Sequence, residues 1–162
     1  MSKLILANIN DIQDIMEIIS DAKTYLKNQG SSQWNLEDGY PNECDLIKDI
    51  KNNECYLYIE NDIIIGIMVI MESKDENYDE IDGNWFNDDE YVSIHRIAVR
   101  NNFHNQQIGY KMLKLAETII MNKNPKITIG PMSKLKTKFD IKKYGLTVFK
   151  LLYVYLVASN TF

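Results

Sequence analysis

One stretch constrains the fold of this chain more than any other: an apolar run from Tyr91 to Val99 that passes through a short polar segment into helical periodicity. The run is rich in β-branched and aromatic residues, which is typical of a strand. After it, one helical face ends before Pro125 and consists of Ile108, Met112, Leu115, Ala116 and Ile119. The sequence therefore predicts a strand, a polar loop with one glycine, and a helix in direct succession.

Such a junction is a candidate anion site. The first amides of a helix lack an intrahelical partner and lie at the positive end of the helix dipole, so a phosphate there gains hydrogen bonds and a favourable field together. No Gly-x-Gly occurs in the chain, and no glycine is followed by Lys and then Ser or Thr. These absences exclude the Rossmann and P-loop types of nucleotide site.

The N-terminal part predicts a strand and two helices. Lys3 to Ala7 is a short strand, and a helix then begins at a capping pair, Asn10 with Gln13. The apolar face of that helix contains Ile9, Ile12, Met16, Ile19, Ala22 and Leu26. A polar loop from Gln29 to Pro41 leads to a second helix, which begins at a second capping pair, Asn42 with Asp45. The core face of the second helix contains Leu46, Ile47 and Ile50.

The next two apolar runs predict a tight antiparallel hairpin, because Asn61-Asp62 separates Cys55–Glu60 from Ile63–Met71. Residues Glu72 to Glu90 form an acidic, polar loop around Trp85 and Phe86. After the junction described above come a strand from Lys126 to Ile129, a lysine-rich helix up to Tyr144, and an apolar strand from Leu146 to Ala158. We find no internal repeat and no domain boundary, so residues 1–162 are expected to form one domain.

Composition narrows the class of protein. Lys and Arg total 18 against 23 for Asp and Glu, and this net charge of −5 disfavours nucleic acid or an anionic membrane as a partner. Two cysteines, Cys44 and Cys55, cannot form a disulfide framework and are expected to be reduced packing residues. His95 and His104 are the two histidines, and no zinc-ligand spacing occurs, so no metal is expected. No signal peptide or membrane-spanning run is visible, which makes the cytoplasm the expected compartment.

The strand and loop resemble the GNAT superfamily of acetyl-CoA-dependent N-acetyltransferases. Arg96-Ile-Ala-Val99 matches the end of the family's fourth strand, and the loop follows the pattern Q/R-x-x-G-x-G/A with His104 at the first position, Gln107 in place of the first glycine, and Gly109 retained. Gln33-Trp34, Gly39-Tyr-Pro-Asn42 and Asp82-Gly-Asn-Trp85 resemble a bacterial subgroup of unassigned substrate. The resemblance covers Met1 to about Ile129, and residues 130–162 are atypical.

The resemblance implies a fold and a cofactor. The expected fold is α/β, with a mixed, mostly antiparallel sheet flanked by helices and splayed between the fourth and fifth strands, where acetyl-CoA enters. The strand backbone would pair with the pantetheine arm and the loop amides would hold the pyrophosphate. The cofactor-binding residues implied in this way are Ile97, Ala98, Val99, His104, Asn105, Gln106, Gln107, Ile108, Gly109 and Tyr110.

The resemblance also implies direct acetyl transfer to a primary amine on a small molecule or peptide. An amine of pKa ~10.4 is neutral in roughly one molecule in 2,500 at pH 7, so a base must take its proton. The family often has a glutamate where this chain has Ser93, and His95, on the same strand face, is the candidate base. Tyr144 and Tyr153 are candidate proton donors, and Trp34, Tyr40 and Trp85 are candidate acceptor-binding aromatics.

Other interpretations of the same residues stay open. His95 could be a hydrogen-bonded structural residue, and the aromatics could be packing residues. Ser93, Gln107, Ile141 in place of the usual acid tyrosine, and the altered tail all favour a rival class, a non-catalytic CoA- or ligand-binding module. Residues 146–158 contain no usual turn residue, and they predict a single apolar strand that contributes to a homo-oligomer contact. A late reading-frame change is an alternative account of the tail, with weak activity as its consequence.

Overall fold

The structure, a computed structural model, describes residues 1–31, 33–34, 39–71, 91–123 and 128–129. Five strands, three α-helices and two short 3₁₀ helices occur in these residues. In chain order they are β1 (Ser2–Leu6), η1 (Ile9–Asp11), α1 (Ile12–Asn28), α2 (Glu43–Lys51), β2 (Cys55–Glu60), β3 (Ile63–Met71), β4 (Tyr91–Val99), η3 (Asn101–Phe103), α3 (Ile108–Lys123) and β5 (Thr128–Ile129).

The strands form one sheet in the order β1-β2-β3-β4-β5. The first four are antiparallel to their neighbours, and β5 pairs in parallel with the start of β4, at Tyr91 with Thr128 and Val92 with Ile129. The described fold is therefore the expected α/β fold with a mixed, mostly antiparallel sheet. The expected splay between β4 and β5 would lie beyond Ile129, outside the described residues.

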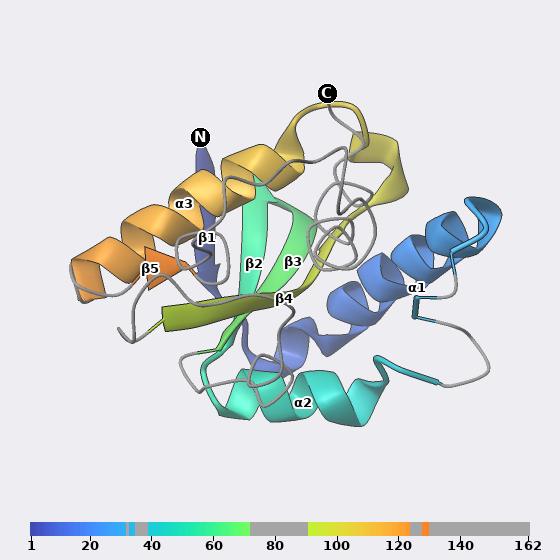
Figure 1. The fold of residues 1–162 in the computed structure, drawn as a ribbon, viewed down its shortest axis with the longest axis horizontal. Helices are drawn as coiled ribbons and strands as arrows, with labels where there is room; N and C mark the ends of the chain where they lie inside the picture. The colour runs from blue at the N-terminus through green and yellow to red at the C-terminus, as the bar shows by residue number, and fades with distance from the viewer. Residues whose placement is uncertain (32, 35–38, 72–90, 124–127, 130–162) are drawn as a thin grey trace, which may run out of the picture.

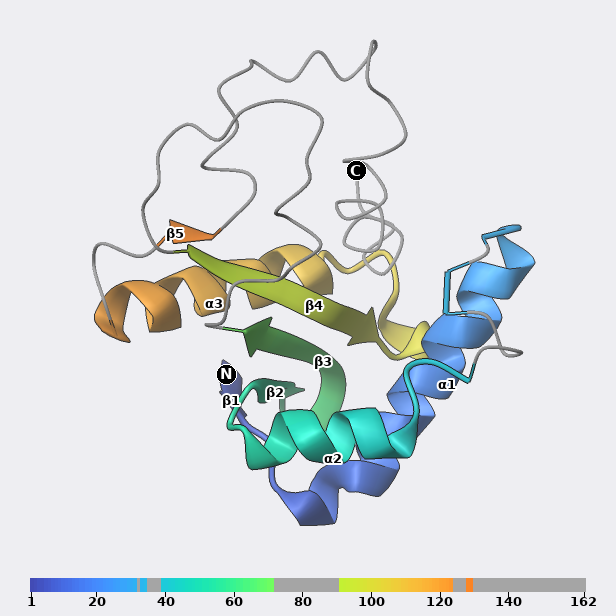
Figure 2. The same ribbon diagram turned by 60° about the horizontal axis from the view of Figure 1, so that its bottom comes forward.

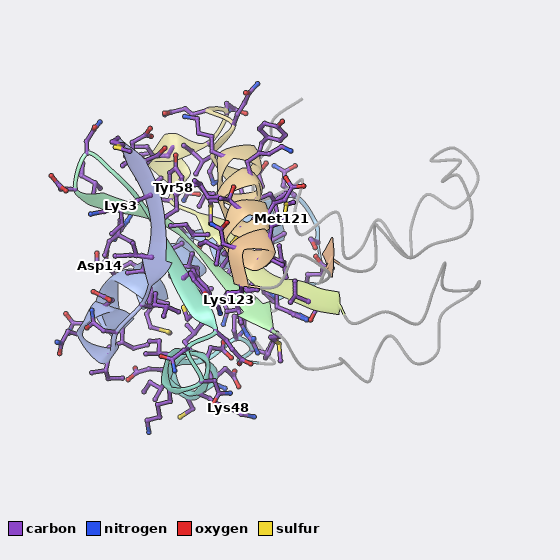
Figure 3. The ribbon with its side chains drawn as sticks, turned by 90° about the vertical axis from the view of Figure 1, so that its left-hand side faces the viewer. Lys3, Asp14, Lys48, Tyr58, Met121 and Lys123 are labelled. Carbon is purple, nitrogen blue, oxygen red and sulfur yellow. The ribbon has the colours of Figure 1, made fainter. Side chains whose placement is uncertain are left out.

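Helices cover both faces of the sheet (Figures 1 and 2). In Figure 3, Asp14 and Lys48 mark α1 and α2 on one side of the sheet, and Met121 and Lys123 mark α3 on the other. The core under α3 includes the fully buried side chains of Tyr58, Met68 and Met112. The core under α1 and α2 includes Ile15, Leu46 and Ile67. The sheet therefore lies between two separate apolar clusters, and β4 contributes side chains to both.

The sequence places most helix and strand ends correctly. The predicted bounds of β2, β3 and β4 are those observed, and the capping pair of α2 is confirmed, since Asn42 Oδ1 accepts from the Asp45 amide at 3.1 Å and Asp45 Oδ2 accepts from the Asn42 amide at 2.8 Å. Asn61 and Asp62 both have positive φ, 51° and 62°, as a two-residue type I′ hairpin turn requires.

The predicted start of the first helix was wrong. The capping box is formed by Asn8 with Asp11 and begins η1, so the pair Asn10 and Gln13 does not cap the helix. The first strand is also displaced by one residue, because Ala7 ends its pairing with a bond to the Cys55 carbonyl and lies outside β1. Either asparagine fits a cap pattern, and the hydrogen bonds select the earlier one.

The two thiols differ. Cys55 is buried in the core under α1 and α2, as expected for a packing residue, and burial raises its pKa to about 12. Cys44 is exposed on α2, so the expectation that it packs in the core was wrong. A helical residue two positions after the cap faces solvent here because the buried side of α2 begins at Leu46.

Several expectations fall outside the described residues: those for Trp85 and the acidic loop, Tyr144, Tyr153 and the apolar strand at 146–158. In the part of the chain that is described, no helix is both long and apolar enough to cross a membrane. Among the same residues, no group of three His, Cys, Asp or Glu side chains is arranged to hold a metal ion.

Candidate active site

A bulge interrupts β4 at Arg96. Val69 pairs with His95 and Ile67 with Ala98, so that Met68 of β3 faces two residues of β4, Arg96 and Ile97. Arg96 adopts a left-handed φ of 48°, which bulky residues rarely do. In a regular strand, residues an odd number of positions apart face opposite sides of the sheet. Val92 and Ile97 nevertheless both lie in the core under α3, so the extra residue at the bulge reverses the alternation of side chains along β4.

Next to the bulge, β3 and β4 approach each other closely at Gly66, beneath Met112 of α3. A Cβ atom at Gly66 would lie 2.8 Å from the Ala98 carbonyl oxygen and 3.0 Å from the Met112 sulfur. Both distances are shorter than ordinary contacts, so the strand pair can approach this closely only where β3 has no side chain. Gly66 therefore fixes the path of β4 just after the bulge.

His95 lies on the face that sequence alternation predicted. Its Nε2 atom is 3.0 Å from the hydroxyl of Ser93, which confirms that the two side chains share one side of β4. Ser93 is fully buried, whereas His95 is half-buried. The hydroxyl can therefore orient an imidazole that still reaches the surface of the strand.

The loop after β4 and the first turn of α3 contain a row of backbone amide donors. Asn105 and Gln107 have left-handed φ angles of 63° and 57°, and α3 begins directly afterwards at Ile108. Within the described residues, no hydrogen bond is donated by the backbone amides of Asn105 to Tyr110. These amides lie in the loop and first turn of a helix, where the dipole favours negative charge.

The His104 side chain turns away from this row of amides. Its Nε2 donates to the Val99 carbonyl at 3.1 Å, and its backbone amide donates to the Asn101 carbonyl at 3.2 Å. Its ring packs against the Tyr25 ring in a T-shaped arrangement, with the ring centroids 4.8 Å apart. His104 thus ties the loop to the end of β4 and to α1. Its amide and Nε2 are engaged within the protein, unlike the donors that follow it.

Arg100 fastens the same loop to α1. Its guanidinium pairs with Asp14 and with Glu17 at 2.8 Å, and its Nε donates to the Ile64 carbonyl at 2.9 Å. The Asn101 amide adds a bond to Asp21 Oδ2 at 3.1 Å. Contacts from both α1 and β3 therefore hold the start of the loop.

On the side of β4 that faces α2, Arg96 meets two residues from other segments. Its Nη1 lies 3.1 Å from Asp49 Oδ2 in α2, and its guanidinium carbon lies 5.2 Å from the centre of the Tyr40 ring. Asp49 is only 4% exposed. Burial raises the pKa of Asp49 above its ordinary value, and the nearby Arg96 opposes that rise.

The segment that carries Tyr40 is itself held from α1. Lys23 Nζ donates to the Pro41 carbonyl at 2.8 Å and lies 3.4 Å from that of Gly39. Partial burial lowers the pKa of Lys23, and Asp45 opposes this shift. Trp34 packs against the core under α1 and α2, whereas Tyr40 is 42% exposed.

The structure thus brings His95 and Tyr40 to one side of β4 and places the donors of Asn105 to Tyr110 at its end. Asp49 and the bulge at Arg96 were missed by sequence reasoning. A signal for Asp49 did exist: it lies three residues after Leu46 and next to Ile50, which puts an acidic residue on the core face of a helix. Ile47, predicted for that face, is only half-buried.

Comparison with known proteins gives one family. A family model described as "Acetyltransferase (GNAT) family" matches residues 12–129. No curated protein matches the chain. Among solved structures, a GNAT-family acetyltransferase from Streptococcus agalactiae is similar with a TM-score of 0.64 and 31% identity, covering 76% of this chain and 70% of that one.

Two further structures show the same fold at lower identity. A GNAT-family acetyltransferase from Listeria monocytogenes has a TM-score of 0.61 and 22% identity, and covers 75% of this chain and 71% of that one. The paia N-acetyltransferase of Thermoplasma acidophilum, solved in complex with coenzyme A, has a TM-score of 0.52 and 15% identity, and covers 76% of this chain and 74% of that one.

Proposed function

This chain belongs to the acetyltransferase (GNAT) family, and from that premise we propose that it transfers the acetyl group of acetyl-CoA directly to a primary amine. The observation that carries the proposal is the row of amides from Asn105 to Tyr110 at the start of α3, which donate no hydrogen bond within the described residues. A pyrophosphate supplies the negative charge and the acceptor oxygens that these donors lack. The Thermoplasma relative was solved with coenzyme A, which supports the choice of cofactor.

Gln107 supports rather than weakens this assignment. It occupies the position of the family's first glycine and adopts the left-handed φ of 57° that glycine adopts without strain. Because the backbone keeps the required conformation, its amide remains available to the pyrophosphate. The pantetheine arm would lie along Ile97 to Val99, where no described strand pairs with β4 on the side away from β3. We call Ile97 to Tyr110 the cofactor segment.

The acceptor amine would approach from the side of His95, Tyr40 and Trp34. His95 takes a proton from the ammonium form, directly or through water, and its reference pKa of ~6.5 suits that role near neutrality. The amine nitrogen then attacks the thioester carbonyl carbon, the C–N bond forms, the C–S bond breaks, and the nitrogen loses a second proton to become the amide, which balances the proton gained by the thiolate. The leaving thiolate takes a proton, for which Tyr144 and Tyr153 are the proposed donors. Trp85 completes the proposed set of acceptor-binding aromatics.

A second candidate function is a CoA-binding module without turnover. One observation favours it: Ser93, at the position where the family often has a glutamate, is fully buried and cannot act as a base. If the chain is an enzyme, His95 is the candidate base that remains among the described residues on this face of β4.

The test separates these two functions. Thiol release from acetyl-CoA is followed against a panel of primary amines, with CoA affinity measured in parallel by calorimetry. Turnover with any amine supports the enzyme and excludes the module, and CoA binding without turnover supports the module. No CoA binding at millimolar concentration would remove the basis of both.

We also propose that residues 146–158 contribute to a homo-oligomer contact. The support is the apolar sequence of this segment, which has no clean polar face. Light scattering at micromolar protein concentration checks this proposal, and a clean monomer would contradict it.

A further inference from the structure

Arg96 joins three segments that are far apart in the sequence. It lies at the bulge of β4, its ion-pair partner Asp49 lies in α2, and Tyr40, which covers its guanidinium, lies in the connection between α1 and α2. In the reaction proposed above, the first segment carries His95 and the last forms a wall on the acceptor side. The contacts of one side chain therefore connect the two parts that an acceptor must touch.

The pair is poorly suited to a purely stabilising role. The side chains of Arg96 and Asp49 are 13% and 6% exposed, so both charges lose most of their hydration. Their contact is an ion pair without hydrogen-bond alignment, and Arg96 Nε is buried without an acceptor among the described residues. Buried pairs of this quality often contribute less than apolar side chains of similar size would. The raised pKa of Asp49 agrees, since it means that burial outweighs the attraction of Arg96.

The backbone at Arg96 adds a further cost. A left-handed φ is unfavourable in a residue other than glycine, and glycine would adopt it freely. If the bulge alone mattered, glycine would suit this position better than arginine. The guanidinium therefore needs a role of its own.

We propose that Arg96, paired with Asp49 and covered by the Tyr40 ring, is a positioning residue that holds the acceptor-side segment 39–42 against β4 in alignment with His95. The inference rests on the proposed function, because it takes His95 and segment 39–42 to meet the acceptor. Lys23 and the capping box of Asn42 hold the segment from α1 and α2, and Arg96 supplies the contact from the sheet.

Two variants separate the roles of side chain and backbone. Arg96→Gly keeps a residue that adopts the bulge conformation without strain and removes the guanidinium. Asp49→Asn keeps the shape of the partner and removes its charge. Glu117→Gln is the matched control, because Glu117 forms an exposed ion pair with Lys114 on α3, away from the site. Circular dichroism and cooperative unfolding establish that each variant is folded.

The first measurement is amide hydrogen exchange at residues 40–46, where the Asn42, Asp45 and Leu46 amides are hydrogen-bonded at the start of α2. We expect exchange at these amides to accelerate about tenfold in Arg96→Gly and Asp49→Asn, while amides of β2 and α3 keep their wild-type rates. The double variant should be no faster than either single one, since both changes remove the same contact. Glu117→Gln should match the wild type.

The second measurement is steady-state turnover with an amine that the wild type acetylates. We expect kcat/KM for the amine to fall roughly 10- to 100-fold in both variants, as small misplacements of reacting groups do, with KM for acetyl-CoA unchanged. Wild-type exchange at residues 40–46 in folded Arg96→Gly and Asp49→Asn would overturn the inference, and so would full turnover in Arg96→Gly. If the wild type has no turnover or binds no CoA, the proposed function fails, and the exchange result still decides whether Arg96 holds the segment.

Discussion

The proposed cofactor segment, from Ile97 to Tyr110, would offer a ligand backbone amides, whereas the proposed acceptor side, around Arg96, Asp49 and Tyr40, would offer side chains. Every residue except proline supplies the same backbone amide, so a substitution such as Gln107 for glycine leaves the donors in place. Side-chain contacts require particular residues in separate segments. The difference teaches that cofactor use can be recognised from a family pattern, while acceptor choice depends on contacts specific to this chain.

The largest difference between the proposed acceptor side and the cofactor segment is expected in the variant His95→Ala. We expect kcat to fall by roughly 10²–10⁴ because a general base is lost, with CoA affinity unchanged because the amides of the cofactor segment are intact. Turnover is measured by thiol release and affinity by calorimetry. A variant with the wild-type rate at every pH from 6 to 9 would show that His95 is structural.

A change at Gln107, in contrast, should affect the affinity for CoA. Gln107→Pro removes one amide donor and imposes φ near −65° where the chain needs +57°, so CoA should bind roughly 10- to 100-fold more weakly. Gln107→Gly is the matched control and should bind CoA at least as well as the wild type, because glycine adopts this conformation without strain. Calorimetry with CoA measures both. Equal affinities for the Pro and Gly variants would place the pyrophosphate elsewhere.

Gly66 tests the packing beneath the cofactor segment. Gly66→Ala places a methyl group 2.8 Å from the Ala98 carbonyl oxygen, which is backbone and cannot move aside cheaply, so we expect a loss of about 1–3 kcal/mol in unfolding free energy. Gly30→Ala is the comparison, because nothing lies within 4 Å there and only its φ of 72° opposes the change. Urea unfolding measures both, and a Gly66→Ala variant as stable as the wild type would contradict the close approach.

The smallest effect is expected in the pH dependence of stability at Asp49. Burial raises its pKa above 3.8, so the stabilisation by proton binding is fully present below pH 3.8 and is lost as pH rises through the higher pKa of the folded protein. Asn cannot titrate. The unfolding free energy of the wild type minus that of Asp49→Asn should therefore decrease across this window, with a slope of at most about 1.4 kcal/mol per pH unit. Urea unfolding from pH 3 to 7 measures it, and a difference that increases with pH would refute the shift.

Sequence reasoning succeeded where one local rule decides the structure. The hairpin at Asn61-Asp62, the cap at Asn42 and the strand from Tyr91 to Val99 each depend on neighbouring residues, and the structure has all three. The strand, loop and helix of the proposed cofactor segment are continuous in the chain, and the structure has this succession of elements at β4, η3 and α3.

Two of the misses, the bulge at Arg96 and the burial of Asp49, have a common cause. The bulge at Arg96 depends on the register between β3 and β4, and the burial of Asp49 in α2 depends on a partner in β4. At the first helix, Asn8 and Asn10 satisfy similar local patterns, and only the observed bonds to Asp11 distinguish them. Contacts between distant segments set the bulge and the burial of Asp49, so a pattern confined to one segment could not predict them, whereas the first cap was missed because two local patterns overlap.

The sheet order has a consequence for how the chain reaches its native state. In the order β1-β2-β3-β4-β5, the two-residue turn Asn61-Asp62 joins β2 to β3, whereas α1 and α2 separate β1 from β2 and α3 separates β4 from the parallel strand β5. Contacts between near neighbours in the sequence form faster, because less loop-closure entropy opposes them. The hairpin of β2 and β3 is therefore expected to nucleate folding, and the β4–β5 pair to form late. Substitutions in that hairpin should slow refolding, and substitutions near Thr128 should mainly accelerate unfolding.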